Sequence, residues 1–589
     1  MIQIAGRVRS FRNRWLSVWV LGFLLLGSGF VTGSAQAVPA MGAEALRFLP
    51  VQDAGRVKPF DTFARESMQL IYGSESFTSA RGEKRPAIEI IFTWMLLPQY
   101  WDEQKIVRID HKGLKDSLKL ENEEKYFAPK ELFANPRLTL VMQELQAFSV
   151  TKQKMTPYFS AAQRLESQLG TFQAIKTGQA VRVVPPTPEE LKAAEANAGQ
   201  VPMAPQKWQA VGELQGEAQV KFQEIIHALV KALPAPGSED SAATQVEPAD
   251  GASLGLAVER FKSFARARNP ELYPSETDIS IEVHEKTFHP FKITWALYLV
   301  AAILVAISWH LGNRKAYAAG WFVGVLAFLI HTYGFGLRVY LTGRPPVSNM
   351  YESVIWVSWG CFVFAMIFEA LSLRRFVLIS GALVGVICLI IADLAPTILD
   401  SSLQPLEPVL RSNMWLTIHV LTITLSYSAF FLAWGLGNLG LGFLLRGFGQ
   451  NDERVRDLVL SIYRCVQIGV VLLAAGIILG GVWADYSWGR FWGWDPKETW
   501  AFIALLGYIA ILHGRLVGWV KNVGMLVTSI MAFNLVIMAW YGVNFVLGAG
   551  LHTYGMGAGG VQYVAAVVLL NILYVGYATY VSSARRKNA

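Results

Sequence analysis

Long apolar runs separated by short loops fill the second half of the chain, and they restrict it to folds that a lipid bilayer can hold. Because a membrane-crossing helix needs about 20 apolar residues, we predict nine spans. They cover residues 292–311, 317–340, 351–371, 376–395, 413–445, 460–483, 499–519, 523–547 and 561–582. The fifth run is too long for one straight span, so we expect it to extend beyond the bilayer or to bend at Gly435 or Gly437. The sequence therefore predicts a polytopic α-helical membrane protein.

Composition supports this fold class and excludes several functions. Hydrophobic residues make up 53% of the chain and charged residues only 16%, less charge than a soluble protein of this length carries. The net charge of +8 fits cytoplasmic loops of a membrane protein, and no basic patch with interleaved aromatics points to nucleic acid. The three cysteines form neither CxxC nor CxxCH, which excludes a thioredoxin-like redox role and a c-type cytochrome.

The amino terminus has the pattern of an export signal. Four arginines precede an apolar stretch, residues 15–31, and the sequence Ala35-Gln-Ala37 follows it. A basic region, an apolar region and an A-x-A end are typical of a signal peptide. We therefore interpret residues 1–37 as a signal peptide or, alternatively, as an uncleaved anchor.

Residues 38–290 are polar and charged, unlike the rest of the chain. We predict a mainly helical domain on the external side of the membrane. Two stretches rich in Pro, Ala, Gly, Ser and acidic residues, near 184–206 and 234–253, are expected to be flexible loops. Residues 291–589 then form the membrane domain.

The distribution of charge fixes the predicted orientation. Basic residues gather in alternate loops, which the positive-inside rule assigns to the cytoplasm: Arg314 and Lys315, Arg374 and Arg375, Arg446 to Arg456, Arg515 with Lys521, and Arg585 to Lys587. The other loops, and residues 38–290, then face the periplasm of a bacterial inner membrane. Four basic residues break the pattern on that side, either as solvated charges or as binders of anionic groups: Arg344, Arg411, Arg490 and Lys497.

One external loop is unusually rich in tryptophan. The Trp segment, residues 483–500, contains Trp483, Trp488, Trp492, Trp494 and Trp500. An interfacial aromatic belt would explain one or two such rings at a helix end. The density and the interspersed glycines favour a surface for a large flat apolar ligand, because rings can stack on it and glycines allow close approach.

Residues 488–500 resemble the WWD signature, WGxxWxWDxKETW, of a superfamily of haem-handling membrane proteins. This superfamily includes CcsA (ResC) of system II cytochrome c synthesis, and CcmC and CcmF of system I. Residues 343–353 resemble the GHxPxSNxYES segment that opens the CcsA core, with Arg344 where the family often has His. Residues 49–61 resemble the segment that precedes this core in CcsB–CcsA-like chains. The resemblance covers about 317–582 and this short stretch.

Two histidines flank the Trp segment on the predicted external face. His419 lies near the external end of the fifth span, and His552 follows the eighth. Haem iron takes axial imidazoles, so we predict a bis-His iron site, although each residue alone could equally cap a helix. These positions also resemble the paired external histidines of the superfamily.

A second, inner site is predicted around His513. This residue lies roughly 21 Å below the external face at about 1.5 Å per residue, and ionisable residues in spans are functional candidates. It resembles the transmembrane His thought to hold haem in transit; the alternative is an interfacial His beside Arg515. We choose His331 as the second ligand, with His310 as its competitor, and the partner could also belong to another chain.

The resemblance implies a function in cytochrome c assembly. Haem b would be ligated by the histidines and lined by Trp488, Trp492, Trp494, Asp495 and Trp500, with Arg490 and Lys497 orienting the loop or the propionates. The substrate would be an apocytochrome c with a CxxCH motif, and the chain would be a component of a cytochrome c synthase (haem lyase). A complete CcsB half has several spans before its external domain, so a separate ResB/CcsB-like partner is expected.

Three alternatives remain open. The chain could export haem without ligating it, or it could act as a CcmF- or CcmC-like protein of system I. A proton or ion transporter is a third class, but it leaves the Trp segment unexplained. Few intramembrane acids support it, since Glu369 and Asp393 lie near span ends.

Overall fold

The computed structural model describes residues 42–78, 82, 84–151, 155–197, 207–232, 248–372, 374–395, 398–406, 412–548 and 560–588. The predicted signal peptide or anchor and His552 lie outside the described residues. The chain divides into two compact units, one comprising Met1–Leu46 with Val220–Phe261 and the other Arg47–Gln219 with Lys262–Ala589.

The smaller unit is built around two helices, α10 (Gly216–Ala232) and α11 (Pro248–Arg268), most of whose residues belong to it. Phe222 and Phe261 meet edge to face, with ring centroids 5.4 Å apart. The Nη1 atom of Arg260 lies 3.8 Å from a carboxylate oxygen of Glu224. An aromatic contact and a surface ion pair therefore join the two helices.

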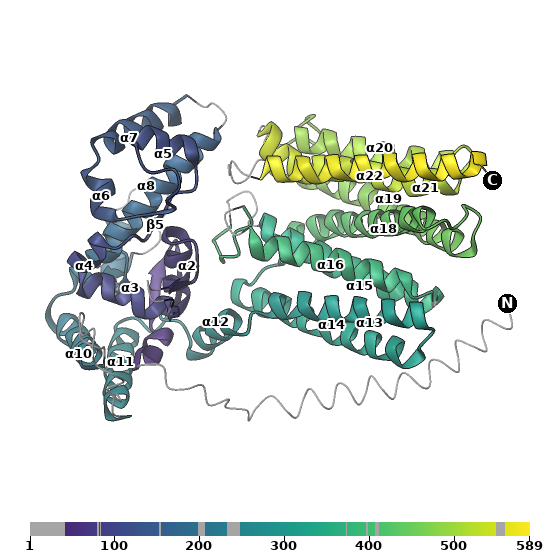
Figure 1. The fold of residues 1–589 in the computed structure, drawn as a ribbon. Helices are drawn as coiled ribbons and strands as arrows, with labels where there is room; N and C mark the ends of the chain where they lie inside the picture. The colour runs from purple at the N-terminus through teal and green to yellow at the C-terminus, as the bar shows by residue number, and fades with distance from the viewer. Residues whose placement is uncertain are drawn as a thin grey trace. The chain divides into compact units, whose positions relative to one another are not determined.

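The polar part of the larger unit is mainly helical (Figure 1). Its described residues also form three small antiparallel sheets, of order β2-β1-β7-β8, β3-β4 and β5-β6. Its elements, with η1 at the junction of the units, are η1 (Gly42–Phe48), β1 (Pro50–Asp53), β2 (Arg56–Pro59), α2 (Phe60–Ile71), β3 (Ser76–Thr78), β4 (Lys84–Pro86), α3 (Ala87–Leu96), α4 (Pro98–Glu103), β5 (Val107–Arg108), α5 (Lys112–Leu118), β6 (Tyr126–Phe127), α6 (Pro129–Ala134), α7 (Pro136–Ser149), α8 (Pro157–Lys176), β7 (Arg182–Val184), α9 (Pro188–Asn197), β8 (Gln209–Ala210), η2 (Val211–Glu213) and α12 (Glu276–Phe288).

Residues 49–61, which resemble a segment of CcsB–CcsA-like chains, include the hairpin β1–β2. Its turn holds Ala54 and Gly55 at positive φ. Two residues of strand β2, Arg56 and Lys58, are basic and pair with carboxylates. Lys58 is almost fully buried between Asp53 and Glu66, at 2.7 and 2.6 Å. Arg56 makes two hydrogen bonds, of 2.9 and 2.8 Å, to Glu282 of α12. The hairpin is thus attached to the helix that leads into the first span.

Helical structure occupies part of both stretches that we expected to be loops. Helix α9 lies within 184–206 because Thr187 and Glu190 form a reciprocal cap: the Thr187 N–H donates to Glu190 Oε2 at 2.8 Å, and the Glu190 N–H donates to Thr187 Oγ1 at 3.2 Å. Alanine, glutamate and lysine then favour the helix. Helix α11 begins at Pro248, within 234–253, because proline is well suited to the first helical position.

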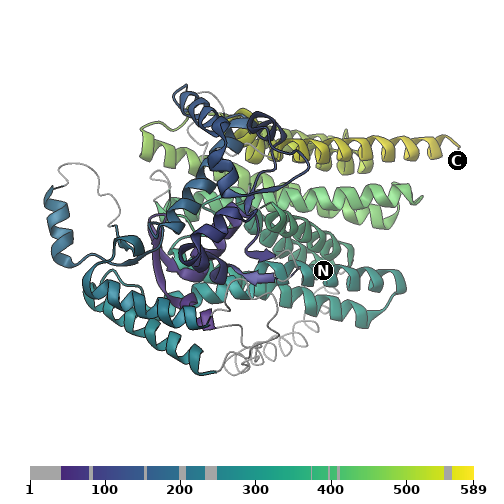
Figure 2. The same cartoon turned by 60° about the vertical axis from the view of Figure 1, so that its left-hand side comes forward.

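Nine helices of the described ranges are long and apolar enough to cross a membrane, which confirms the predicted fold class. Figures 1 and 2 show them running side by side. They are α13 (Pro290–Leu311), which continues α12, α14 (Arg314–Thr342), α15 (Met350–Ser372), α16 (Phe376–Leu394), α18 (Leu421–Leu445) with α17 (Asn413–Trp415) and η4 (Leu416–Val420), α19 (Glu453–Trp488), α20 (Pro496–Leu516), α21 (Asn522–Ile537) with η5 (Met538–Leu547), and α22 (Val561–Asn588).

The fifth predicted span has no break in its helix at Gly435 or Gly437. Helix α18 runs without interruption through both glycines, which serve as points of close packing. A Cβ at Gly435 would lie 2.6 Å from Ser380 Oγ, and one at Gly437 would lie 2.5 Å from Ser529 Oγ. The irregular part of this span is the π-helix η4 near its start.

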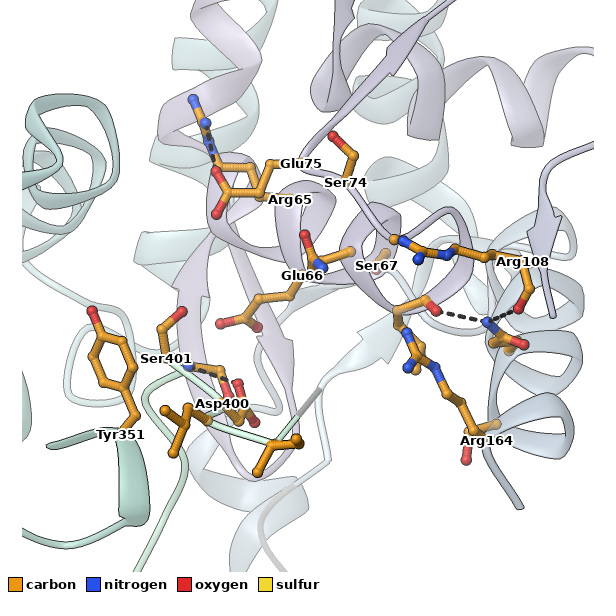
Figure 3. A pocket seen from close by; sticks show the side chains of 18 of the residues that line it. Arg65, Glu66, Ser67, Ser74, Glu75, Arg108, Arg164, Tyr351, Asp400 and Ser401 are labelled. Atoms are coloured by element: carbon orange, nitrogen blue, oxygen red, sulfur yellow. Dashed lines mark hydrogen bonds and ion pairs between the residues drawn. The ribbon is translucent and has the colours of Figure 1, made fainter. Parts of the chain in front are cut away.

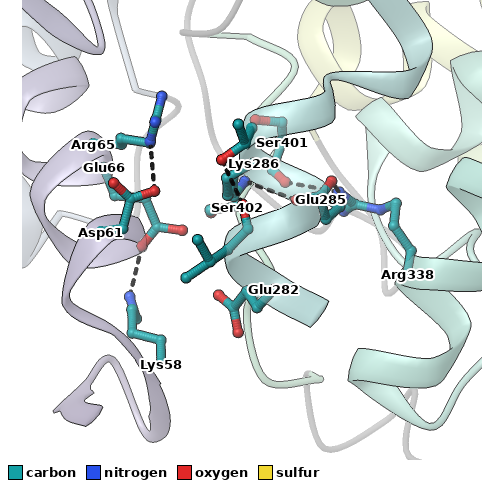
Figure 4. Close-up of polar contacts among 12 residues, drawn as sticks. Lys58, Asp61, Arg65, Glu66, Glu282, Glu285, Lys286, Arg338, Ser401 and Ser402 are labelled. Carbon is teal, nitrogen blue, oxygen red and sulfur yellow. Dashed lines mark hydrogen bonds and ion pairs between the residues drawn. The ribbon is translucent and has the colours of Figure 1, made fainter. Parts of the chain in front are cut away.

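A buried ion pair joins α14 to α15. Arg338 and Glu352 are each only 1% exposed and lie 2.9 Å apart. Glu352 also accepts hydrogen bonds from the backbone N–H and Oγ of Ser348, at 2.8 and 2.7 Å. Arg338 donates to the Ser401 carbonyl at 3.1 Å and lies 3.8 Å from Glu285 of α12 (Figure 4). The pair therefore holds two helices, a loop and α12 together.

Candidate functional site

The Trp segment is more helical than we predicted. Helix α19 continues to Trp488, where Gly489 ends it at φ 66° and donates its N–H to the Asp485 carbonyl at 2.8 Å. Helix α20 already begins at Pro496. Only residues 489–495 are irregular, because a left-handed glycine at one end and an N-cap at the other stop the two helices.

Glu498 holds this short turn in place. Its carboxylate accepts hydrogen bonds from Arg490 Nη1 at 3.1 Å, from the Gly493 N–H at 2.8 Å and from the Asp495 N–H at 3.2 Å. The turn includes Trp494 at φ 55°, a conformation that non-glycine residues rarely adopt. The capping carboxylate therefore stabilises a strained, tryptophan-bearing backbone.

Asp495 is the N-cap of α20 and accepts a hydrogen bond from the Lys497 N–H at 2.9 Å. It is 6% exposed. Its side chain thus contacts the end of the helix. Asp495 shapes the Trp segment because it sets the residue at which α20 begins. The predicted direct contact of Asp495 with a ligand stays a prediction.

The tryptophan rings differ in exposure. Trp494 is 69% exposed, whereas Trp492 lies edge to face with both Trp494 and Phe502, at 5.8 and 6.2 Å. The indole Nε1 of Trp492 is buried and lacks a hydrogen-bond partner among the described residues. The guanidinium of Arg490 lies 5.5 Å from the centroid of Trp488, and Trp500 is partly buried on α20.

His419 lies in the π-helix η4 and contacts α19. Its Nδ1 is 2.8 Å from the Gly476 carbonyl oxygen, which can only accept, so Nδ1 carries the hydrogen and Nε2 the lone pair. The ring is edge to face with Trp483 at 5.7 Å. A Cβ at Gly480 would lie 2.6 Å from Cε1 of the imidazole, so the close approach requires glycine there.

A second π-helix, η5, precedes the segment that contains His552. It ends at Gly548, which has φ 57°. His552 itself lies outside the described residues, so its predicted pairing with His419 stays a prediction. Because π-helices are rare and often mark functional sites, their occurrence at His419 and just before His552 identifies both segments as unusual.

Lys497 connects the Trp segment to η5. Its Nζ donates to Asn544 Oδ1 at 3.4 Å. The Asn544 amide nitrogen in turn donates to the Trp540 carbonyl at 3.0 Å and contacts Met350 Sδ at 3.4 Å. Sequence reasoning did not single out Asn544, because only the fold brings residues 350, 497 and 544 together.

His513 lies on α20, three residues before its end at Leu516. It is exposed, and its Nδ1 is 2.9 Å from the Ile509 carbonyl oxygen. His310 is likewise exposed near the end of α13. The inner-site role of His513 stays a prediction.

His331 is enclosed in the core of the membrane domain. It is fully buried, its Nδ1 lies 3.3 Å from the Tyr298 hydroxyl, and it packs on Phe335 and Phe291 with centroids 5.1 and 5.6 Å away. Nε2 has no hydrogen-bond partner in the part of the chain that the structure describes. A flat ligand would require this cluster to repack, so its role as second ligand remains an untested prediction.

A large cavity of about 2130 Å³ lies within the larger unit, and sequence reasoning missed it (Figure 3). Its walls come from α2, α8 and neighbouring loops, from the start of α13, and from residues on both sides of the segment 549–559. Examples are Arg65, Arg164, Asp400, Asn544 and Tyr563. No local sequence signal could reveal it, because the lining residues are far apart in the chain.

Charges on the cavity wall are mostly paired. Arg65 lies 3.3 Å from Glu75, and Lys292 lies 3.2 Å from Asp393. Burial alone would raise the pKa of Glu75, but the positive charges of Lys286 and Arg65 outweigh it and hold the pKa below its ordinary value. The wall therefore carries charges of both signs that stabilise one another.

Comparisons with known proteins point to one family. The family described as Cytochrome C assembly protein matches residues 347–552. Cytochrome c biogenesis protein CcsA of Parasynechococcus marenigrum is 32% identical over 300 residues, covering 45% of this chain and 97% of that protein. CcsA of Guillardia theta is 31% identical over 298 residues, covering 46% of this chain and 97% of its own length.

A longer relative extends the match. Protein NrfI of Wolinella succinogenes is 27% identical over 520 residues, which covers 85% of this chain. The chain spans 53% of the length of NrfI. The similarity to NrfI therefore reaches well beyond the stretch that the family match covers.

Proposed function

Because the chain belongs to the cytochrome c assembly protein family, we propose that it binds haem beside the Trp segment and promotes its covalent attachment to CxxCH motifs of apocytochromes c. Family membership places the chain in cytochrome c biogenesis. The candidate spans of the described residues make it an integral membrane protein. Haem binding, and the covalent attachment of haem to apocytochromes, are the parts of this function that we propose.

The geometry of His419 is the observation that carries the proposal. An iron-ligating imidazole usually donates its second N–H to a carbonyl or carboxylate, which fixes the tautomer and the ring direction. The 2.8 Å contact of Nδ1 with the Gly476 carbonyl supplies this arrangement. Nε2 then carries the lone pair that an iron ligand needs.

The surroundings of His419 fit a flat apolar substrate. Trp483 contacts the imidazole edge to face. Farther along the Trp segment, the exposed ring of Trp494 and the adjoining ring of Trp492 offer aromatic surface. Aromatic rings bind such a substrate by stacking. In the proposal His552 supplies the second axial imidazole, and haem b is the substrate carried.

The chain's own contribution to the reaction is positioning. Each cysteine thiol of CxxCH adds across one vinyl group: a carbon–sulfur bond forms, the thiol hydrogen passes to the neighbouring vinyl carbon, and no atom leaves. The addition needs no nucleophile from this chain. Holding both reactants together makes a slow bimolecular step effectively unimolecular.

We also propose where the protein lies in the cell, by which path haem reaches the Trp segment and which protein acts with this chain. The basic loops favour a bacterial inner membrane with the Trp segment and the N-terminal region in the periplasm, after export directed by residues 1–37. His513 would hold haem earlier on its path. A ResB/CcsB-like membrane protein would act with this chain, as in system II.

Spectroscopy of the purified full chain tests the proposal. In a host that makes haem, we expect the protein to show the reduced spectrum of six-coordinate, bis-imidazole haem. His419→Gly and His552→Gly should each lose this spectrum and attach at least tenfold less haem to a CxxCH reporter, because one axial ligand is removed. The reporter assay includes the partner protein.

The exposed His227→Gly serves as the control, since His227 is a histidine of α10, outside the spans, to which no role is assigned. It should retain spectrum and attachment. Normal attachment in both the His419 and His552 variants would refute the external site. Haem export with an unmodified reporter in the wild type would instead favour transport alone.

A further inference from the structure

We propose that a groove among α13, α16, α18 and α22 binds an anionic phospholipid, with Arg446 at the phosphate. The groove has a volume of about 350 Å³ and lies toward the end of the spans that we predict to be cytoplasmic. It shares no residue with the Trp segment or with the large cavity. The inference therefore goes beyond the proposed function and does not depend on it.

The walls of the groove suit a hydrocarbon chain. Trp309 of α13 and Phe443 of α18 stack, with ring centroids 5.4 Å apart. Gly442 leaves space between the helices, because a Cβ built there would meet only the Tyr574 hydroxyl among the described residues, at 3.5 Å. The remaining apolar side chains of the lining are Ala306, Phe376, Ile379 and Leu439.

The polar groups of the wall already have partners within the protein. The Asn571 amide donates to Asn438 Oδ1 at 2.9 Å, and the Asn438 amide donates to the Trp434 carbonyl at 2.9 Å. The Tyr574 hydroxyl donates to the Asn438 carbonyl at 3.1 Å. Because these groups satisfy one another, the wall requires no polar partner from a ligand, and the part of the ligand that enters should be apolar.

The mouth of the groove is basic. Arg446 follows the last residue of α18, is exposed, and makes no ion pair with any described carboxylate. Arg585 of α22 lies beside it, and its Nη1 donates to the carbonyls of Leu444 and Leu445 at 3.3 and 2.7 Å. The end of α18 supplies only a partial negative charge to these two cations.

Acidic residues on the same side of the spans are engaged elsewhere. Glu453 and Asp457 both pair with Arg374, at 2.9 and 3.1 Å. Asp452 caps α19, and Glu369 accepts hydrogen bonds from backbone N–H groups at the start of α16. The two cations at the mouth therefore favour an anion from outside the chain.

The position of the groove identifies this anion as a lipid. Exposed apolar side chains flank it, Ile303 and Ile307 on α13 and Leu570 and Leu573 on α22. Among the described spans α22 is the least buried, with only 11% of its most apolar stretch inside the protein. Basic pockets between spans at the cytoplasmic face bind anionic lipid headgroups. A phospholipid in the groove would join α22 to α13 and α16.

Native mass spectrometry of the purified full chain in an uncharged detergent tests the proposal. The probes are dioleoyl phosphatidylglycerol and dioleoyl phosphatidylcholine, which share their acyl chains and differ in net charge. Wild type should bind the first about fivefold more tightly, because basic residues attract the anionic headgroup. Arg446→Gln should lose most of this preference. Gly442→Leu should bind both lipids about tenfold more weakly, because the added side chain fills the groove.

Two variants control for charge and for added volume. Arg314→Gln removes an exposed arginine of the same side, at the start of α14, and should keep the preference. Gly336→Leu adds the same side chain where nothing lies within 4 Å of a Cβ, and should bind both lipids as wild type does.

Three outcomes would overturn the inference. They are equal affinity of wild type for the two lipids, an unchanged preference in Arg446→Gln, and undiminished lipid binding in Gly442→Leu. Displacement of bound phosphatidylglycerol by equimolar iron protoporphyrin IX would also overturn it, because the groove would then be a site for haem rather than for a phospholipid.

Discussion

The imidazole of His419 lies directly against Gly480 of the neighbouring helix, so that a Cβ at position 480 would stand 2.6 Å from Cε1 and 3.0 Å from Nδ1. The hydrogen bond from Nδ1 to Gly476 lies one helical turn away on the same face of α19. The direction of this imidazole is therefore set by two glycines of α19.

Gly480→Ala should displace the His419 ring without unfolding the protein. The added methyl group clashes with the ring, and the ring must tilt away from α19, which breaks the Nδ1 contact and moves Nε2. We expect at least a tenfold loss of the bis-imidazole haem signal with normal expression, measured by reduced absorbance spectra of the purified variant.

Gly336→Ala is the control, because nothing lies within 4 Å of a Cβ built there. It makes the same chemical change on another span, α14. Both variants should have similar unfolding temperatures. An unchanged haem signal in Gly480→Ala would contradict the role of the ring direction.

Glu498→Ala should loosen the turn at residues 489–495. The change removes the acceptor of two backbone N–H groups and the partner of Arg490. Because two backbone N–H groups lose a charged acceptor and the left-handed Trp494 loses its support, we expect about 1–3 kcal/mol of local destabilisation. Trypsin should then cleave after Arg490 several-fold faster than in wild type.

The matched control is Glu453→Ala at the other end of α19, where the glutamate pairs with Arg374 at 2.9 Å but is 67% exposed. Exposed ion pairs contribute little, so cleavage after Arg490 should not change. If Glu498→Ala leaves that cleavage at the wild-type rate, the carboxylate does not hold the turn.

Acid should selectively remove the stabilisation that Glu75 provides. Lys286 and Arg65 hold the pKa of Glu75 below 4.5 against the effect of burial, so its ionised form favours the folded state. This contribution is present above about pH 4.5 and is lost as the pH falls through the folded pKa. Glu75→Gln should therefore lower the unfolding temperature at pH 7, and the difference from wild type should vanish at low pH.

Glu121→Gln, at an exposed position, is the comparison for this pH series. Its unfolding temperature should follow wild type at every pH. A Glu75→Gln deficit that persists unchanged to pH 3 would show that packing, rather than charge, stabilises this position.

The sequence predicted the spans well because their signal is local. The fourth predicted span, 376–395, differs from α16 by one residue, since an apolar run of bilayer length has few alternatives. The π-helix at His419 could not be predicted, because it depends on how η4 packs on α19. The end of α19 at Trp488 was missed because a dense tryptophan run looks like a loop.

The site shows the same division between local and tertiary information. The Trp segment and the two flanking histidines follow from residue type and order. The hydrogen-bond partners of Arg490 and Lys497 do not follow from the sequence. They depend on Glu498 lying over the turn and on Asn544 of η5 lying beside Lys497. Burial of His331 is likewise invisible in sequence, since both a core and a ligand histidine can lie in an apolar run.

The pair Arg338–Glu352 should act as a unit. Removing one member of a buried pair leaves an uncompensated charge, which costs about 3–5 kcal/mol, so Arg338→Met and Glu352→Gln should each lower the unfolding temperature strongly. In the double variant neither member of the pair leaves its partner's charge uncompensated, and the loss should be smaller than the sum of the single effects. Unfolding of the three purified variants in detergent measures this coupling. Strictly additive losses would show that the ion pair contributes through packing alone. The contacts of Glu352 with Ser348 and of Arg338 with Ser401 would then be independent of the ion pair.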